Sequence, residues 1–372
     1  MAKNVLVTGG CGFVGSHLVD ALLAHGHHVR VLDNLDPQVH GGKLPDYLNP
    51  EVELLRGDVQ DPAAVVKALK GIDVVFHLAA VVGVGQSMYE ISRYVGTNTL
   101  GTAVLLQALL RRQSKVQKLV IASSMSIYGE GKYSCTNCGT VTPPLRPAEQ
   151  LQNKEWEMVC LQCGSQLEPI PTDESKSLQC SSIYALSKKD QEEMSLLFGR
   201  TYNLPVVALR YFNIYGPRQA LSNPYTGVAA IFASRMLNGN PPLVFEDGKQ
   251  MRDFVSVNDV VRANILAMER SAGDGKALNI GSGQPISISE VASVLGSALH
   301  TGIGCQLTEK YRAGDIRHCF ADISAAKACL GYKPQMRFAD GVKDLVGWLE
   351  SQKPTDRVVE AFAQLNSFGL AA

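Results

Sequence analysis

The sequence lacks both a long hydrophobic run and an excess of charge of either sign. No apolar stretch reaches the ~18 residues that a membrane-spanning helix needs. Lys and Arg together number 35, as do Asp and Glu, so overall charge favours neither nucleic acid nor an anionic membrane as a partner. The first apolar segment begins at Asn4, which leaves no room for a signal peptide before it. We therefore expect a cytoplasmic protein without a membrane or nucleic-acid partner.

Strand-like apolar runs alternate with helical patterns along the first third of the chain. The 372 residues are 45% hydrophobic and 19% charged, which is typical of a soluble globular protein. The alternation predicts an α/β fold with a doubly wound parallel sheet, whose ligand lies beyond the carboxyl ends of the strands. The expected strands are 4–8, 29–33, 51–55, 74–80 and 118–122, and the expected helices include 62–69, 92–113, 181–202, 258–270 and 354–367.

Three glycines follow the first expected strand directly. Gly9 permits a tight turn, Gly12 allows the backbone to approach a pyrophosphate, and Gly15 allows the following helix to pack on the strand. The N-terminus of that helix offers unpaired N–H groups to an anion. The chain has 34 glycines, so a plain strand–turn–helix is the alternative reading of this triplet alone. The pattern predicts a dinucleotide site.

The second expected strand, 29–33, ends in an acidic residue. Asp33 lies 18 residues beyond Gly15, close to the ~20-residue offset of the ribose-binding acid in dinucleotide folds. A carboxylate there accepts hydrogen bonds from both ribose hydroxyls and repels a 2′-phosphate. No arginine follows, since the next residues are Asn34 and Leu35. This favours NAD over NADP, the alternative being a solvated acid at a strand end.

Hydroxyl groups and a lysine provide candidate chemistry at the same edge of the sheet. Ser123, Ser124 and Ser126 follow the strand at 118–122. Tyr184 and Lys188 are four residues apart and therefore share one face of the expected helix. A nearby ammonium lowers the pKa of a phenol from ~10, which makes it a usable base near neutral pH. Without further context, the alternatives are a polar strand end and a solvated helix face.

Four of the nine cysteines form two Cys-x-x-Cys-Gly motifs. Cys135 and Cys138 are separated by 21 residues, 139–159, from Cys160 and Cys163. Two such motifs place four thiolates around one tetrahedral ion, so we expect a structural Zn²⁺ without an open catalytic position. Reduced or disulfide-paired cysteines are the alternative. The remaining cysteines lack ligand spacing and are expected to be buried or inert: Cys11, Cys180, Cys305, Cys319 and Cys329.

Several motifs occur together in an order that resembles a known family. The chain is similar to the extended short-chain dehydrogenase/reductase family, in particular to its NAD-dependent nucleotide-sugar epimerases and dehydratases. The resemblance extends from Lys3 to about Leu349, apart from an insertion at 131–172 that is longer than typical members have. The motifs that carry it are Thr8–Gly15, Asp33, Gly57-Asp58, His77–Ala80, Ser124, Tyr184-x-x-x-Lys188 and Arg210–Asn213.

The resemblance implies roles for residues on the cofactor side. Tyr184 is implied as the acid/base, Lys188 as the residue that binds the nicotinamide ribose and tunes Tyr184, and Ser124 as a hydrogen-bond partner of the sugar hydroxyl. Asn98 matches an asparagine near the nicotinamide. The implied cofactor-binding set is Gly9, Gly12, Phe13, Val14, Gly15, Asp33, Asn34, Asp58, Val59, Leu78, Ala79, Ala80, Asn98, Tyr184 and Lys188.

The resemblance also implies a nucleotide-sugar site. Arg252 and Arg312 are placed on the nucleotide diphosphate, where paired guanidinium groups suit phosphate oxygens. Without the family, the basic segment 310–318 reads as a solvated loop. The glycine-rich loop 81–91 and residues 223–228 are expected to line the sugar. The implied substrate-binding set is Val84, Gln86, Ser87, Ser124, Ser126, Asn213, Arg252, Arg312 and Asp315.

The residues after Ser124 restrict the reaction. Dehydratases of the family carry an Asp-Glu pair there, and decarboxylating members carry a glutamate two residues on, whereas this chain has Met125 and Ser126. The chemistry left is epimerisation at C4 through a 4-keto sugar. Loop 81–91 contains no arginine that would bind a sugar carboxylate. We therefore expect a 6-deoxy sugar. Within the family the chain is most similar to the enzymes that convert dTDP-L-rhamnose to dTDP-6-deoxy-L-talose, with UDP-glucose/UDP-galactose epimerisation as the alternative.

A non-catalytic NAD-binding regulator with a zinc module is an alternative of another class. Against it, residues 131–171 hold more acidic than basic side chains, which disfavours nucleic acid. The insertion is expected either to cap the pocket or to meet a partner subunit, and the sequence leaves both open. Helices 92–113 and 181–203 are expected to pair in a homodimer.

The expected domain organisation follows from the same resemblance. We predict an NAD-binding Rossmann domain at 1–211 plus about 250–275, interrupted by the four-cysteine, zinc-ribbon-like insertion at 131–172. A smaller C-terminal α/β substrate domain is expected at 212–249 and 276–350, followed by a helix and tail at 351–372.

Overall fold

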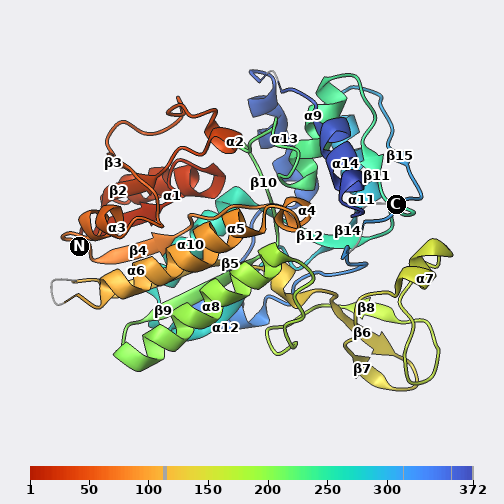
Figure 1. Ribbon diagram of the computed structural model, residues 1–372, viewed down its shortest axis with the longest axis horizontal. Coiled ribbons are helices and arrows are strands. Elements are labelled where there is room, and N and C mark those ends of the chain that lie inside the picture. The colour runs from red at the N-terminus through yellow and green to blue at the C-terminus, as the bar shows by residue number, and fades with distance from the viewer. Residues whose placement is uncertain (112–114, 313, 353, 371–372) are drawn as a thin grey trace.

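A parallel sheet of seven strands forms the centre of the molecule (Figure 1). The computed structural model describes residues 1–111, 115–312, 314–352 and 354–370. The strand order is β13-β9-β5-β4-β1-β2-β3, and every neighbouring pair is parallel. The order changes direction between β1 and β4, which is where such sheets bind ligands. The strands are β1 (Asn4–Thr8), β2 (His28–Asp33), β3 (Glu53–Arg56), β4 (Val74–His77), β5 (Lys118–Ser124), β9 (Val206–Tyr211) and β13 (Lys276–Ile280).

Helices cover both faces of this sheet. One face packs against α1 (Phe13–Ala24), α10 (Val257–Glu269) and α12 (Ser324–Leu330). The other face carries α3 (Pro62–Ala68), α6 (Gly101–Leu109) and α8 (Ile183–Tyr202). None of the helices in the described ranges has the length and hydropathy of a membrane span. The predicted doubly wound α/β fold is thus confirmed.

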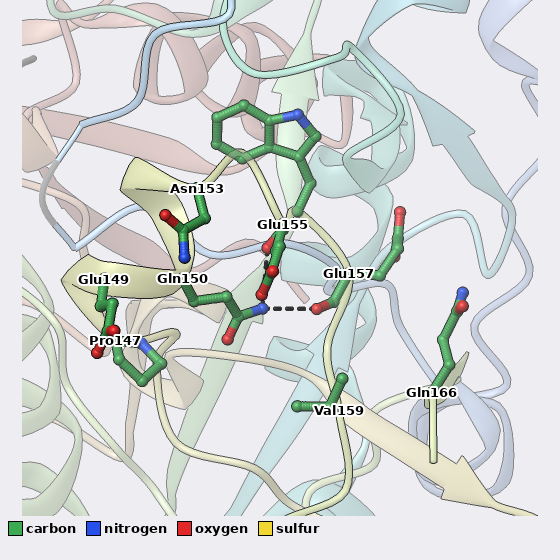
Figure 2. Close-up of a pocket in the computed structure, with 9 residues that line it drawn as sticks. Pro147, Glu149, Gln150, Asn153, Glu155, Glu157, Val159 and Gln166 are labelled. Atoms are coloured by element: carbon green, nitrogen blue, oxygen red, sulfur yellow. Dashed lines mark hydrogen bonds between the residues drawn. The ribbon is translucent and has the colours of Figure 1, made fainter. Parts of the chain in front are cut away.

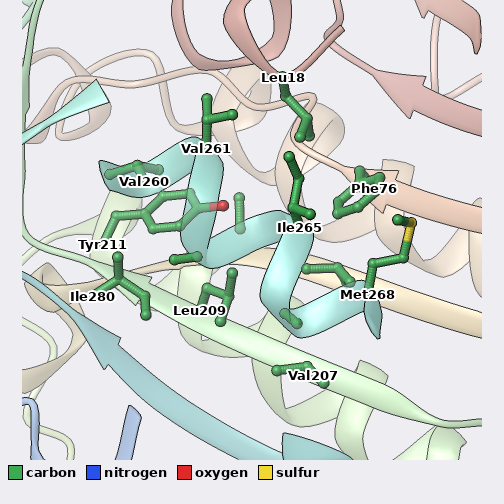
Figure 3. Close-up of a cluster of buried hydrophobic side chains, with 14 of the residues drawn as sticks. Leu18, Phe76, Val207, Leu209, Tyr211, Val260, Val261, Ile265, Met268 and Ile280 are labelled. Atoms are coloured by element: carbon green, nitrogen blue, oxygen red, sulfur yellow. The ribbon is translucent and has the colours of Figure 1, made fainter. Parts of the chain in front are cut away.

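Strand β9 shows how the sheet is buried on both sides. Val207, Leu209 and Tyr211 belong to the core beneath α10, whereas Val206 and Ala208 belong to the core beneath α8. Because side chains alternate along a strand, a sheet covered on both faces needs a continuous apolar run. Figure 3 shows the first group meeting Val260, Val261, Ile265 and Met268 of α10.

The predicted helix 92–113 is divided into three parts. It consists of α5 (Ile91–Tyr94), a π-helical segment η1 (Val95–Leu100) and α6. Residues 112 and 113 lie outside the described residues. The predicted loop 81–91 contains the short helix α4 (Val84–Ser87). Further short helices are α2 (Pro37–His40), η2 (Met125–Tyr128) and η3 (Ser271–Gly273).

A second group of elements lies beside one end of the sheet. Strands β10 (Asn213–Tyr215), β12 (Met251–Ser256) and β14 (Pro285–Ser287) form one small sheet, and β11 (Leu243–Val244) pairs with β15 (Gln306–Leu307). An apolar core joins them to helices. These helices are α9 (Val228–Leu237), α11 (Ile288–Ala298) and α13 (Phe338–Leu349), and α14 (Val358–Ser367) lies in the same part of the molecule in Figure 1.

Two strands differ from the predicted domain boundaries. Residues 276–280 were assigned to the substrate domain, but β13 pairs with β9 and forms the edge of the seven-stranded sheet. Residues 251–256 were assigned to the Rossmann domain, but β12 pairs with β10 and β14. The chain therefore returns from the small sheet to the seven-stranded sheet at β13, later than the predicted ranges place it.

The insertion forms a small unit that projects from the lower right of Figure 1. Its sheet has the order β7-β6-β8 and is antiparallel. Tyr133, Met158 and Leu167 form its core together with the cysteines. The elements are β6 (Lys132–Cys135), β7 (Gly139–Val141), α7 (Ala148–Gln152) and β8 (Glu168–Ile170).

Candidate active site

The glycine turn joins β1 to α1 at the carboxyl edge of the sheet. A Cβ atom on Gly9 would lie 2.8 Å from the Ala79 nitrogen, and one on Gly15 would lie 2.1 Å from the Gly9 oxygen. The N-cap residue of α1, Gly12, supplies no side-chain acceptor to the first turn. No capping side chain therefore competes with an anion for the N–H groups of the first turn of α1, and the pyrophosphate site there stays a prediction.

Asp33 is buried at the end of β2 and holds the glycine turn. Its carboxylate accepts the N–H of Cys11 at 3.0 Å and the N–H of Leu35 at 2.9 Å. Burial, followed by the charge of Asp33, raises the pKa of the Cys11 thiol to about 12, so this cysteine is inert as expected. Asp58 lies next along this edge, where it accepts the Asn34 amide at 2.9 Å. The predicted adenosine-side residues are thus brought together.

Not every remaining cysteine is buried. Cys319 is buried, and burial raises the pKa of its thiol to about 12. Cys180, Cys305 and Cys329 are partly exposed, so of the two expected states, buried or inert, the first does not apply to them.

Tyr184 and Ser124 meet where β5 ends beside the start of α8. Ser182 caps α8 through a 3.1 Å bond from the Ala185 N–H, which fixes the turn that carries Tyr184. Burial raises the pKa of Tyr184, and its hydrogen bond with Ser124 opposes the shift. This differs from the prediction that an ammonium lowers the pKa, because desolvation is the dominant effect here. The Ser124 hydroxyl also accepts a 2.9 Å bond from Ser126.

Lys188 lies one turn beyond Tyr184 and is almost completely buried. Its ammonium donates to the carbonyl oxygen of Ala122 and to the amide oxygen of Gln191, the latter at 2.7 Å. Burial lowers the pKa of Lys188 to about 7, an effect that Glu192 opposes. The amide nitrogen of Gln191 donates to the hydroxyl oxygen of Thr102 at 2.8 Å. The same hydroxyl is hydrogen-bonded to Nε2 of His77 at 3.0 Å. Sequence spacing gave no sign of Gln191.

Asn98 sits in the π-helical segment with its side chain fully buried. Its amide oxygen accepts the N–H of Val81 at 2.8 Å, and its amide nitrogen donates to Ser187 at 2.9 Å. It therefore ties the loop after Ala80 to α8. π-Helical turns recur at functional sites, and the position of Asn98 beside the nicotinamide stays a prediction.

The predicted sugar loop directs most of its polar atoms into the protein. Gln86 is buried and bonds to Gln38, Glu90 and Tyr94. Ser87 is fully buried and donates to the Val84 carbonyl at 2.6 Å, which differs from the predicted sugar contact because the hydroxyl closes its own helical turn. Val84 remains exposed.

Tyr94 connects this loop with the predicted catalytic tyrosine. Its hydroxyl donates to Gln86 at 3.1 Å, and its ring packs edge-on against that of Tyr184 at 6.3 Å. No sequence signal singled out Tyr94.

Asn213 carries an unused acceptor. Its side-chain oxygen is buried and has no hydrogen-bond partner among the described residues. A buried amide oxygen without a partner is costly, so this atom is suited to a ligand donor. The contact of Asn213 with the substrate stays a prediction.

The two predicted diphosphate arginines both contact the segment 315–317. Arg252 donates to the carbonyl oxygens of Ile316 and Arg317 at 2.7 and 2.8 Å. Arg312 donates to Asp315 at 2.8 Å and lies over the ring of Phe245 at 4.6 Å. The segment is not a solvated loop throughout, because Arg317 is fully buried.

The four predicted metal ligands come together at the tip of the insertion. The sulfur atoms of Cys135, Cys138, Cys160 and Cys163 all lie within 4.8 Å of one another. A tetrahedral zinc–thiolate site has sulfur–sulfur separations of about 3.8 Å. Gly139 and Gly164 follow the two motifs with φ of 75° and 73°, the left-handed turns that such motifs require. The donor set therefore fits a structural zinc ion.

A hollow of about 570 Å³ lies on the same insertion (Figure 2). None of the predicted catalytic residues lines it. Glu149, Glu155 and Glu157 make its wall acidic, which is unsuited to a nucleotide diphosphate. Its lining residues are Pro147, Glu149, Gln150, Asn153, Glu155, Trp156, Glu157, Val159 and Gln166.

The last helix, α14, also reaches segments assigned to the substrate. Phe368, directly after it, stacks on Tyr89 at 4.8 Å, and Gln364 accepts a 3.0 Å bond from Tyr225. Phe362 packs on Phe245 at 5.9 Å. No function was predicted for this helix, because its contacts are distant along the chain.

Comparisons with known proteins agree with this architecture. The chain matches the NAD dependent epimerase/dehydratase family over residues 5–150 and 158–281. It is 34% identical to the dTDP-L-rhamnose 4-epimerase of Burkholderia thailandensis, with 94% of this chain and 96% of the relative covered. It is 33% identical to a putative UDP-glucose 4-epimerase of Methanocaldococcus jannaschii, with 94% and 100% covered.

Solved structures give the same relationship. The UDP-glucose 4-epimerase of Thermotoga maritima with UDP-glucose has a TM-score of 0.76 and 32% identity, covering 93% of this chain and 98% of that one. The Thermus thermophilus UDP-glucose 4-epimerase in complex with NAD has a TM-score of 0.74 and 30% identity, covering 94% and 100%. These findings confirm the predicted resemblance: the chain belongs to the NAD-dependent epimerase/dehydratase family, within the extended short-chain dehydrogenases/reductases.

Proposed function

We propose that this protein is a nucleotide-sugar 4-epimerase that works with tightly held NAD. The observation that carries the proposal is the convergence of Tyr184, Ser124 and Lys188 at the carboxyl edge of the sheet, next to the glycine turn. Met125 and Ser126 occupy the positions where the family's dehydratases carry acids. The remaining chemistry is oxidation and re-reduction at one carbon.

The residues present fit NAD. The glycine turn leaves room for the pyrophosphate, and Asp33 presents a carboxylate to the adenosine ribose while Asp58 lies beside it. Lys188 and Asn98 lie on the nicotinamide side. NAD, when bound, accepts a hydride from the sugar C4 and returns it.

The side chains supply the proton chemistry. Tyr184 takes the proton of the C4 hydroxyl as that carbon is oxidised, and Ser124 holds the same hydroxyl. The resulting 4-keto sugar rotates about its diphosphate bonds, so that its other face meets the cofactor, while Arg252 and Arg312 hold the nucleotide. Tyr184 then returns the proton after reduction from the opposite face. Burial of Tyr184 and Lys188 excludes water from this exchange.

We further propose that the substrate is dTDP-L-rhamnose and the product dTDP-6-deoxy-L-talose. The exposed Val84, at the start of α4, suits the apolar C6 methyl group of a 6-deoxy sugar. The identity to the Burkholderia enzyme supports this choice. UDP-glucose/UDP-galactose is the second candidate, because the Methanocaldococcus relative and the Thermotoga structure are almost equally similar.

The structural zinc is part of the proposal. Cys135, Cys138, Cys160 and Cys163 would use all four tetrahedral positions, so the ion would stabilise the insertion and take no part in catalysis.

A homodimer is the proposed assembly. Ile91, Val95, Leu100, Leu186 and Leu197 are each at least 41% exposed on α5, η1 and α8, which pack together. Apolar side chains gathered on neighbouring helices favour a contact between copies. Leu100→Glu combined with Leu197→Glu is expected to convert the dimer to a monomer in sedimentation analysis, and a wild-type monomer would contradict this proposal.

One incubation tests the function. The purified protein, without added NAD, is mixed with dTDP-L-rhamnose or with UDP-galactose, and the sugar nucleotides are resolved by chromatography and NMR. Conversion of dTDP-L-rhamnose to its C4 epimer is expected. Conversion of UDP-galactose alone would reject the rhamnose assignment, and no conversion of either, with NAD supplied, would reject both substrates.

A further inference from the structure

Two charged side chains of the insertion, the buried Arg146 and the partly buried Glu157, bond to residues outside the cysteine cluster. The first, Arg146, forms a bidentate pair with Glu246 through bonds of 3.0 and 2.7 Å. The two side chains are 1% and 2% exposed. Arg146 also donates to the carbonyl oxygen of Trp156 within the insertion and to that of Asp315, at 2.9 and 3.4 Å. It therefore links the insertion to the segment beside Arg312.

The second of these side chains, Glu157, reaches the same segment. Its carboxylate accepts from Arg317, whose side chain is fully buried, and from the ring of His318 at 3.2 Å. Hydrogen bonds from His318 and then from Arg317 lower the pKa of Glu157 to about 2, against the effect of burial. Arg317 also bonds to Glu246 and Asp247 at 2.8 and 2.7 Å. The insertion thus shares one charge network with residues 246–247 and 317–318, whose centre at Arg146, Glu246 and Arg317 is buried.

The backbone at both ends of the insertion follows the same segment. The N–H of Gly131 donates to the His318 carbonyl at 2.9 Å, and the N–H of Thr172 donates to the Phe320 carbonyl at 2.8 Å. Glu130 accepts the N–H groups of both Arg317 and His318 at 2.7 Å. Residues 317–320 are therefore held by the insertion through main chain as well as side chains.

The predicted diphosphate arginines depend on this segment for their positions. Arg252 is fixed by the carbonyl oxygens of Ile316 and Arg317, and Arg312 by the carboxylate of Asp315. A guanidinium that is already immobilised loses less conformational entropy when it binds phosphate. A shift of residues 315–317 would displace both arginines together.

We propose that Arg146 and Glu157 are positioning residues for nucleotide binding. By holding residues 315–318, the insertion places Arg252 and Arg312 for the diphosphate, without touching the cofactor or the reacting carbon. This inference rests on the proposed function. It assigns the insertion a role in substrate affinity, where the sequence had left a cap or a subunit contact as the alternatives.

The test compares nucleotide affinity with cofactor retention in Glu157→Gln. This change preserves the shape of the side chain and removes its charge, leaving Arg317 with fewer ionic partners. The dissociation constants of dTDP and UDP are measured by calorimetry, together with bound NAD and with KM and kcat. We expect the nucleotide dissociation constant and KM to rise roughly tenfold, within the range for residues that act through others. Bound NAD and kcat are expected to stay within about twofold, since the altered group acts through Arg252 and Arg312.

Two further variants complete the test. Lys154→Gln breaks another ion pair of the insertion, with Glu309, but both side chains are more than half exposed, at 56% and 61%. Exposed pairs contribute little, so this control is expected to change affinity by less than about twofold. Arg146→Lys retains the buried charge but loses the bidentate geometry, and we expect a weakening in the same direction as Glu157→Gln. It also supplies the measurement if Glu157→Gln does not fold.

Each outcome is decisive. Unchanged nucleotide affinity in the folded variants would overturn the inference, as would equal losses of NAD, kcat and affinity, which indicate general damage to the structure. Wild-type protein that binds neither dTDP nor UDP would overturn the proposed function as well. Weakened nucleotide binding with NAD retained would support the inference.

Discussion

The cofactor side and the substrate side of this molecule are assembled in different ways. On the cofactor side, Asp33 accepts a bond from Cys11 across 22 residues of sequence, and the glycine turn, Asp33 and Ser124 each lie at the end of a strand of one sheet. On the substrate side, Arg146 meets Glu246 across 100 residues, and Glu157 meets Arg317 across 160. Local backbone geometry builds the first region, whereas buried charge pairs between distant segments build the second.

This difference predicts two kinds of damage. A change on the cofactor side should stop the chemistry or alter the stability of the central sheet. A change on the substrate side should weaken binding of the nucleotide sugar and leave the chemical step intact. The following predictions test the separation, beginning with the largest free-energy effect.

Cys135→Ser is expected to remove the metal from the insertion. Structural zinc sites bind with apparent free energies of about 10–16 kcal/mol, and the loss of one of four thiolates should lower the content from about one equivalent per chain to under a tenth. Elemental analysis and thermal unfolding measure the result, and bound NAD should remain. Cys305→Ser, at a cysteine outside the cluster, is the control. A metal-free wild-type protein would contradict the prediction.

Tyr184→Phe is expected to abolish turnover while NAD stays bound. Loss of a general acid/base lowers rates by about 10²–10⁴-fold. Epimerisation is followed by NMR, and the cofactor is quantified after denaturation. Tyr202→Phe, an exposed tyrosine at the end of the same helix, should behave like wild type. Turnover that survives in Tyr184→Phe would show that Tyr184 is not the acid/base, whereas wild-type protein that holds NAD but converts no nucleotide sugar would favour the non-catalytic regulator.

His77 should make the central sheet sensitive to acid. Burial lowers its pKa to about 3, followed by the smaller effect of Lys188. Between about pH 6.5 and 3 the unfolded chain therefore binds a proton that the folded chain does not, so stability falls as the pH falls. We expect proton uptake by His77 in the unfolded chain to lower the free energy of unfolding by about 2 kcal/mol between pH 6.5 and 4.5.

Urea unfolding at the two pH values measures this contribution. On acidification from pH 6.5 to 4.5, the free energy of unfolding of His77→Gln should fall by about 2 kcal/mol less than that of the wild type. This comparison does not depend on the stability of the variant at pH 6.5. The exposed His300→Gln should show the wild-type pH dependence. The same pH dependence in wild type and His77→Gln would remove His77 as the cause.

Deletion of α14 is expected to have the smallest effect of these changes, and the effect should be a loss of substrate affinity alone. A chain that ends at Arg357 loses the stacking of Phe368 on Tyr89 and the contact of Phe362 with Phe245. Aromatic pairs contribute about 0.5–1.5 kcal/mol, so KM should rise by roughly two- to tenfold. Steady-state kinetics and the NAD content measure it. Phe368→Ala should reproduce part of the rise, whereas an unchanged KM would show that α14 does not serve the pocket.

The features predicted from sequence are those with local signals. The glycine turn, Asp33 at the end of β2, and Tyr184 with Lys188 on one helix were each visible within a short window. The cysteine cluster was visible for the same reason, because two motifs 21 residues apart define their own geometry. A parallel sheet then brings the cofactor-side features to one edge without further information.

The features that were missed depend on tertiary contacts. Arg317 appears in a basic segment and reads as solvated, yet its partners at 157, 246 and 247 bury it completely. β13 joins the main sheet because β9 offers it a free edge, and no pattern in residues 276–280 reports that. The raised pKa of Tyr184 follows from desolvation, which spacing along a helix does not describe.

The compactness of the cysteine cluster in sequence has a consequence for biosynthesis. All four sulfur ligands lie between residues 135 and 163, so they have left the ribosome well before Glu246 and Arg317 are made. The insertion is therefore able to close during translation, with Arg146 and Glu157 still in water. Arg146 waits for Glu246, 100 residues further along the chain, and Glu157 waits for Arg317, 160 residues further along. The charge pairs that join the insertion to the rest of the chain therefore form only after all four metal ligands have been made.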